Sequence, residues 1–145
     1  MNIAKIEDLS VIESIFAPFK KTYFPHIRQD YLKRNIAAGN VVLEDGVVIV
    51  FGVYKRKQKI GTVEAQRGDA HIGQIVTASQ GSGNASKILL KFFNEMNRDV
   101  WLTVRAENPR ARAFYEKNGM KNVSSISWSE GKIPGVVYKF EKAKQ

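Results

Sequence analysis

The sequence contains no cysteine among its 145 residues. This excludes a disulfide scaffold, a thiolate zinc site and a cysteine nucleophile. Its two histidines, His26 and His71, have no paired ligand spacing, so no metal is expected. The longest apolar run, Val47–Val53, is too short to cross a membrane, and the N-terminal stretch carries acids inside its apolar pattern, unlike a signal peptide. These absences predict a soluble, cytoplasmic protein with no membrane partner.

Positive charge, in contrast, is abundant. The chain has 23 Lys and Arg against 14 Asp and Glu, which gives a net charge of +9. Such an excess attracts anions, whether nucleic acid, acidic protein or a polyphosphorylated cofactor. The one local cluster, Lys55–Lys59, is interpreted as the solvated tip of a hairpin, with a nucleic-acid footprint as the alternative.

Apolar spacing in the first half of the chain predicts two helices followed by strands. The helices are expected at 7–19 and 29–38, and Gly39 is a natural stop for the second. Weak alternation at 2–6 predicts a short first strand. The dipeptide Asp45-Gly46 predicts a tight hairpin turn, and the segment 60–65 is expected to extend the same sheet.

The second half predicts one strand–helix–strand–helix series and a closing hairpin. The strand "AHIGQIVTAS" precedes a helix at 85–96, and the near-continuous apolar strand "DVWLTVRA" is typical of burial on both faces. Asn108 and Pro109 mark the start of the last helix and Gly119 its end. Two final strands enclose "SEGKIPG". This order predicts an α+β fold with one central βαβ unit.

A glycine-rich loop, "QGSGNASK", enters the 85–96 helix, where unpaired backbone N–H groups favour anions. The Walker A pattern fails because Ser86 precedes Lys87. The dinucleotide fingerprint fits Gly81 and Gly83 but meets Ser86 at its third glycine, and its fold needs a longer series of parallel units. A third pattern, Q/R-x-x-G-x-G/A, is satisfied by Gln80 to Ala85.

The segment "ENPRARAFYEKNGM" follows this loop by some thirty residues. It resembles the N-x-x-A-x-x-F-Y-E-K-x-G-F signature of the GCN5-related N-acetyltransferase (GNAT) superfamily. The matching residues are Asn108, Ala111, Phe114, Tyr115, Glu116, Lys117 and Gly119, with Met120 where Phe is usual. The order of elements resembles that family over essentially the whole chain. The segment 47–70 is longer than the family's usual passage, and its part "KRKQKIGTVEAQRGDA" is interpreted as an elaborated hairpin.

The resemblance implies a single GNAT-like domain over 1–145, with a mixed, twisted central sheet, splayed parallel strands and about four flanking helices. It implies acetyl-coenzyme A as co-substrate, held between the strands 71–78 and 99–106. The residues implied to bind it are Ile75, Val76 and Thr77 for the pantetheine arm, Gln80, Gly81, Ser82, Gly83, Asn84, Ala85 and Ser86 for the pyrophosphate, and Asn108 and Tyr115. Arg110 and Arg112 are candidates for the 3′-phosphate, or form a solvated helix face.

The resemblance also implies an amine acetylation in which Tyr115 is the general acid; the alternative is a tyrosine that only packs beside Phe114. The base is open among His71, whose ordinary pKa is about 6.5, Asp69 and Glu64.

Acceptor choice is implied to lie in the segments "APFKKTYFPHIR" and "SWSEGKIPGVVY", with Phe19, Tyr23, Phe24 and Trp128 as possible lining residues. The first segment is basic, which argues against a polycationic acceptor. The expected function is N-acetyl transfer to an amine of a small molecule or protein. The alternatives are a phage-type relative that modifies DNA bases and a non-catalytic acyl-coenzyme A-binding module. The oligomeric state stays open between monomer and homodimer.

Overall fold

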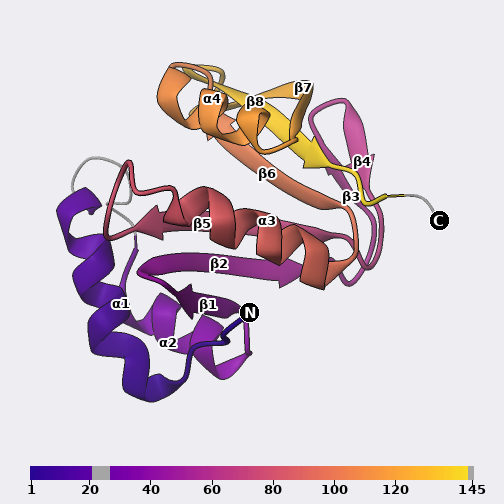
Figure 1. Ribbon diagram of the computed structural model, residues 1–145. Coiled ribbons are helices and arrows are strands. Elements are labelled where there is room, and N and C mark those ends of the chain that lie inside the picture. The colour runs from indigo at the N-terminus through magenta and orange to yellow at the C-terminus, as the bar shows by residue number, and fades with distance from the viewer. Residues whose placement is uncertain (21–26, 144–145) are drawn as a thin grey trace. The chain divides into compact units, whose positions relative to one another are not determined.

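The computed structural model describes residues 1–20 and 27–143 (Figure 1). Its helices are η1 (Ile6–Asp8), α1 (Leu9–Phe16), η2 (Ala17–Phe19), α2 (Gln29–Ala37), α3 (Asn84–Met96) and α4 (Pro109–Lys117). Its strands are β1 (Val41–Glu44), β2 (Val47–Val53), β3 (Gln58–Ile60), β4 (Val63–Ala65), β5 (Ala70–Thr77), β6 (Val100–Arg105), β7 (Lys121–Trp128) and β8 (Ile133–Phe140). No helix in this described part is long and apolar enough to cross a membrane.

Six of the strands form one mixed sheet in the order β1-β2-β5-β6-β8-β7. The β5–β6 pair is parallel, whereas β1–β2, β6–β8 and β7–β8 are antiparallel. Together with the four α-helices of the described residues, this mixed sheet confirms the predicted α+β class.

The chain divides into two compact units, each described here by itself. The first unit comprises Met1–Phe51 and Gly73–Ile88, and the second comprises Gly52–Ile72 and Leu89–Gln145. The chain passes between the units within β2, β5 and α3.

In the first unit, α1 and α2 pack beside β1 and β2 (Figure 1). Apolar residues three or four apart place Ile12, Phe16, Leu32 and Ile36 in the core, as the helical spacing predicts. The prediction of a first strand at 2–6 is wrong. Only an isolated bridge joins Ile3 to Val42, because the chain turns at once into η1.

The turn between β1 and β2 confirms the hairpin expected at Asp45-Gly46. Both residues have positive φ, +51° and +75°, which is the conformation that two-residue hairpin turns require. Gly39 has φ +75° directly after α2 and ends that helix as predicted.

In the second unit, β8 lies between β6 and β7. The prediction that the β6 strand is buried on both faces holds only for its first half. Val100 to Leu102 are buried, whereas Thr103 and Arg105 are exposed. The C-terminal half of β6 is therefore open on one face.

The segment 60–65 does not extend the central sheet, contrary to the prediction. It belongs to a separate hairpin, β3–β4, which confirms the elaborated hairpin expected in this region. The tip of this hairpin is Gly61-Thr62, and the Thr62 N–H donates to Ser124 Oγ of β7 at 2.9 Å. The interpretation of the Lys55–Lys59 cluster as the tip is therefore wrong, since residues 55–57 lie at the opposite, open end and Lys59 lies within β3.

Candidate functional site

The predicted phosphate loop follows β5, and side-chain hydroxyls bond to its backbone. Ser82 Oγ donates to the Ser79 carbonyl at 2.8 Å and accepts from the Asn84 N–H at 3.3 Å. The loop therefore has a defined shape as it enters α3, and it lies wholly in the first unit.

Two glycines give this loop its open backbone. Gly81 and Gly83 have φ of +80° and +86°, and a Cβ built on either would meet no atom within 4 Å. The N–H groups of Gly81, Gly83 and Ala85 have no hydrogen-bond partner among the described residues. Unpaired amides beside open space at a helix N-terminus suit a phosphate group, so these residues fit the pyrophosphate that the resemblance implies.

The β1–β2 turn anchors the loop, a contact that sequence reasoning missed. Lys87 Nζ forms an ion pair with Asp45 Oδ2 at 2.8 Å, and Asn84 Nδ2 donates to the Asp45 carbonyl at 3.2 Å. The Ala78 N–H donates to the Gly46 carbonyl at 2.9 Å. No local pattern relates Asp45 to Lys87, because 42 residues separate them. Since Lys87 already has an acidic partner, we expect an anion to meet mainly the backbone amides of this loop.

The strand that leads into the loop carries the residues predicted for the pantetheine arm. Val76 is buried in the core of the first unit, whereas Ile75 and Thr77 are half-buried. The described parallel ladder of β5 with β6 comprises two pairs, Ala70 with Val100 and His71 with Trp101.

In the second unit, Asn108 is the N-cap of α4, as predicted. Its side chain accepts from the Ala111 N–H at 3.2 Å. Met120, where the family signature usually has Phe, is buried and 2% exposed, so the substitution keeps an apolar side chain in the interior.

Tyr115 lies on α4 with its ring against Phe114 and Tyr138, at centroid distances of 5.5 Å and 5.9 Å. Its hydroxyl has no hydrogen-bond partner among the described residues. Burial raises the pKa of Tyr115 to about 12. The phenol is therefore fully protonated at neutral pH and has a proton to donate.

A hydrogen-bonded group beside Tyr115 was not predicted. Tyr138 Oη donates to Glu116 Oε2 at 2.7 Å and accepts from Arg112 Nε at 3.3 Å. Arg112 Nη1 also donates to the Ala106 carbonyl. The only sequence signal for this group is a tyrosine inside the apolar run "GVVYKF". The Arg112 side chain is therefore fixed by hydrogen bonds to residues of its own unit, whereas Arg110 is exposed.

The three candidate bases lie in the second unit in different surroundings. Asp69 Oδ2 accepts from Trp101 Nε1 at 2.9 Å and from the Gln66 N–H at 2.8 Å. This carboxylate therefore stabilises the fold by joining Trp101 to the turn at Gln66. Glu64 is exposed on β4, opposite Lys59.

His71 is half-buried near the start of β5, with its ring 4.7 Å from that of Tyr54. Gly52 makes room for the imidazole, because a Cβ there would lie 2.6 Å from His71 Nε2. Neither ring nitrogen has a hydrogen-bond partner among the described residues, and burial lowers the pKa of His71. His71 is therefore neutral at pH 7.

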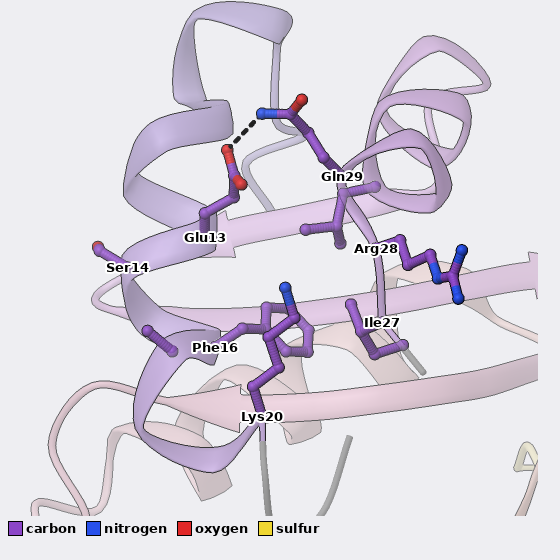
Figure 2. A pocket seen from close by; sticks show the side chains of 9 residues that line it. Glu13, Ser14, Phe16, Lys20, Ile27, Arg28 and Gln29 are labelled. Carbon is purple, nitrogen blue, oxygen red and sulfur yellow. Dashed lines mark hydrogen bonds between the residues drawn. The ribbon is translucent and has the colours of Figure 1, made fainter. Parts of the chain in front are cut away.

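A pocket of about 320 Å³ lies in the first unit between α1 and the start of α2 (Figure 2). Its apolar side chains include Phe16, Ile27 and Leu32, and its charged ones are Glu13, Lys20 and Arg28. Glu13 Oε1 accepts from Gln29 Nε2 at 3.2 Å (Figure 2). Four lining residues, Ala17, Lys20, Ile27 and Arg28, belong to the segment predicted to choose the acceptor.

Of the other predicted acceptor residues, Phe19 packs against the core of the first unit and Trp128 is 37% exposed at the end of β7. Tyr23, Phe24 and His26 lie outside the described residues. Within the described ranges, no group of three or more His, Asp and Glu side chains is arranged to hold a metal ion.

The family comparison decides the assignment of the fold. Residues 6–120 match the model of the acetyltransferase (GNAT) family. The chain belongs to the GNAT family. This confirms the resemblance drawn from the loop and from the Asn108–Met120 segment.

Solved structures of GNAT proteins share this fold at low identity. A GNAT-family acetyltransferase from Bacillus cereus is 16% identical, with a TM-score of 0.71 over 99% of this chain and 96% of that one. The ribosomal-protein-S18-alanine N-acetyltransferase of Escherichia coli is also 16% identical, with a TM-score of 0.68 over 99% and 94%. Arabidopsis thaliana NAA60, solved with acetyl-CoA, is 14% identical, with a TM-score of 0.68 over 97% of both chains. A search of the curated proteins found no match.

Proposed function

We propose that this GNAT protein is an acetyl-coenzyme A-dependent N-acetyltransferase. The observation that carries the proposal is the glycine loop of the first unit. There the amides of Gly81, Gly83 and Ala85 have no acceptor in the described ranges 1–20 and 27–143, and a Cβ at either glycine would enter open space. A pyrophosphate held by backbone amides needs both features.

The coenzyme would be held by Ile75, Val76 and Thr77 along the pantetheine arm and by Gln80 to Ser86 at the phosphates. Asn108 and Tyr115 complete the proposed set. When bound, acetyl-coenzyme A would supply the acetyl group as an activated thioester. NAA60 was solved with acetyl-CoA and the NatC complex with CoA, which supports the same ligand class for a chain of this fold.

Tyr115 is the proposed acid. Its hydroxyl keeps its proton at neutral pH, because burial raises its pKa to about 12. Thiols have a pKa of about 8.5, so a thiol is the stronger acid of the two. We therefore propose that Tyr115 acts by donating a hydrogen bond toward the coenzyme sulfur, where charge develops, rather than by giving up its proton completely.

His71 is the best of the three base candidates. An amine acceptor is mostly protonated at neutral pH and must lose a proton before it attacks. The His71 imidazole is neutral and has no protein partner among the described residues, whereas the Asp69 carboxylate already accepts two hydrogen bonds. Glu64 is exposed, and it lies on the face of β4 opposite to the inward-packed Val63 and Ala65.

The pocket beside α1 is the proposed acceptor site. Apolar side chains line this pocket together with one acidic residue, Glu13, and two basic residues, Lys20 and Arg28. This lining suits an acceptor amine that is neutral or carries negative charge better than it suits a polycation. The acceptor is an amine of a small molecule or of a protein. The names of the Escherichia coli S18-alanine enzyme and of the NatC structure with a Gag peptide favour including peptides among the candidates. We expect the reaction to take place in the cytoplasm.

A nucleic-acid acceptor is the second candidate, and one observation favours it. The positive charge is concentrated in the second unit, where Lys and Arg outnumber Asp and Glu by eight. An acceptor that is a polyanion would be attracted by such a surface.

The test is acetyl-coenzyme A turnover over a panel of peptides, polyamines, small amino compounds and oligonucleotides, together with the thermal shift produced by coenzyme A. We expect a rise in melting temperature with coenzyme A and turnover with at least one class of amine. A thermal shift without turnover would favour a non-catalytic acyl-coenzyme A-binding module. Neither thermal shift nor competition at millimolar coenzyme A would contradict the proposed co-substrate.

A further inference from the structure

The net charge of this chain lies almost entirely in one unit. The first unit has seven Lys and Arg against six Asp and Glu, whereas the second has sixteen against eight. The phosphate loop belongs to the first unit and offers backbone amides. The surplus in the second unit is therefore not explained by the proposed coenzyme loop.

The densest part of that surplus lies at the open end of the β3–β4 hairpin. Backbone bonds of 2.9 Å from the Tyr54 N–H to the Asp69 carbonyl and from the Gly68 N–H to the Tyr54 carbonyl hold the two chain segments side by side. These two segments carry four basic residues that we call the basic cluster: Lys55, Arg56, Lys57 and Arg67. All four are exposed, and none has a carboxylate partner among the described residues.

The β3–β4 hairpin, at whose open end the basic cluster lies, is held in place by contacts at both of its ends. Ile60, Val63 and Ala65 of the hairpin pack with Trp101 and Val137. At the tip, the Thr62 and Ser124 hydroxyls are 2.8 Å apart. At the open end, Arg98 Nη1 donates to the Gly68 carbonyl at 2.8 Å. A cluster held at both ends loses less conformational freedom on binding than one on a loose loop.

The outward surface of this hairpin is polar throughout. Its apolar side chains are turned inward against Trp101 and Val137, so the hairpin presents no residues that would insert into a lipid surface. It also lacks the apolar centre typical of a protein–protein interface. Exposed Lys and Arg on a polar surface suit the hydrophilic phosphate backbone of nucleic acid.

We propose that the basic cluster is a docking site for the phosphate backbone of nucleic acid. The contacts would position a strand without reading its sequence, because Lys and Arg bound to phosphates carry no base information. This site is a property of binding alone and does not depend on the proposed acetyl transfer.

The test compares two variants that lose the same charge. The cluster variant is K55Q/R56Q/K57Q/R67Q, and the control variant is K117Q/K121Q/K132Q/K142Q, which removes four exposed and dispersed lysines of the same unit. Binding of a fluorescent 20-nucleotide single strand and of its duplex is measured by anisotropy at several salt concentrations. The thermal shift with coenzyme A is measured in parallel as a check of folding.

For the unaltered chain, affinity should fall steeply with salt. The cluster variant should bind at least about tenfold more weakly, and its slope of log affinity against log salt should be smaller by about 3, since each lost phosphate contact contributes 0.7 to 0.9. The control variant should change by less than about threefold, and coenzyme A should shift both variants as it shifts the unaltered chain.

Three results would overturn the proposal: equal losses in both variants, an unchanged cluster variant, or no measurable oligonucleotide binding at low salt. The proposal would also fail if polyglutamate or phosphatidylserine vesicles bound more tightly than the oligonucleotide and with the same dependence on the cluster. That result would assign the surface to an acidic protein or a membrane instead.

Discussion

The two units of this GNAT protein differ in the features that suit an anion. The first unit is nearly neutral, and its proposed anion-binding feature is a loop of exposed backbone amides in which Lys87 is paired with Asp45. The second unit is strongly basic, and its basic cluster lies at the open end of the β3–β4 hairpin with no carboxylate partner in the described part of the chain. The position of a phosphate site therefore cannot be inferred from where the net positive charge lies. Helix N-termini bind phosphate through oriented dipoles, whereas surface lysines act through long-range, salt-sensitive attraction.

The same comparison applies to the proposed chemistry. The first unit contributes the proposed coenzyme loop and acceptor pocket, and the second contributes Tyr115 and His71. Substitutions in the first unit should then act mainly on binding, and substitutions at Tyr115 mainly on rate.

The largest effect is expected for Tyr115→Phe. The turnover number should fall about 100-fold, because a positioned proton donor contributes at least that much to catalysis. The melting temperature and the coenzyme A affinity should hardly change, since the Tyr115 hydroxyl has no hydrogen bond to lose among the described residues. Steady-state kinetics and calorimetry measure these quantities.

Tyr138→Phe is the matched control for that experiment. It removes the bonds to Glu116 and Arg112, so it should cost about 1–3 kcal/mol of unfolding free energy. An unchanged rate for Tyr115→Phe would make Tyr115 a packing residue and remove it from the chemistry.

The next effect is expected for Gly81→Ala and Gly83→Ala. Each should weaken coenzyme A binding by about tenfold or more, because the new Cβ enters the space left for phosphate and strains a φ of about +80°. Gly39→Ala provides the matched control, because Gly39 also has positive φ and no atom within 4 Å. All three variants should lose about 1–2 kcal/mol of stability. If the three variants bound coenzyme A with equal affinity, the loop would not be the site that binds the phosphates.

A smaller effect is expected in the pocket. Arg28→Ala should raise KM for the acceptor about three- to tenfold, with little change in the turnover number or in coenzyme A affinity, because it removes one rim contact of the proposed acceptor site. Lys33→Ala, an exposed substitution on α2 outside the pocket, should change none of these quantities. If both variants behaved alike, the acceptor would bind elsewhere.

The smallest effect concerns pH. Burial lowers the pKa of His71 below its unfolded value of about 6.5, so the unfolded chain binds the proton more readily. The contribution of His71 to stability is complete above pH 6.5 and is lost as the pH falls from there toward its folded pKa. The melting temperature should therefore drop by about 1–3 °C more between pH 7.5 and pH 5 than it does in His71→Gln. Parallel curves would show that His71 titrates alike in both states.

The features that could be predicted from the sequence are those that depend on neighbouring residues. The Asp45-Gly46 turn, the Asn108 cap and the glycine loop each follow from backbone conformations that few residue types adopt. The helices α1 and α2 follow from apolar spacing.

The features that could not be predicted depend on contacts between distant segments. The ion pair of Lys87 with Asp45 and the docking of Thr62 on Ser124 join segments 42 and 62 residues apart. Alternation at 2–6 predicted a strand, but five residues offer too few ladder bonds to compete with the turn into η1, which begins at Ile6. The roles of the site residues remain predictions.

The most direct test of the central claim is an amide NMR titration of the ¹⁵N-labelled chain with coenzyme A. The backbone amides of Gly81, Gly83 and Ala85 should show the largest shifts and saturate together, while those of Lys55 to Lys59 should stay unchanged. Shifts confined to the basic hairpin, or none in the loop at millimolar coenzyme A, would contradict the account.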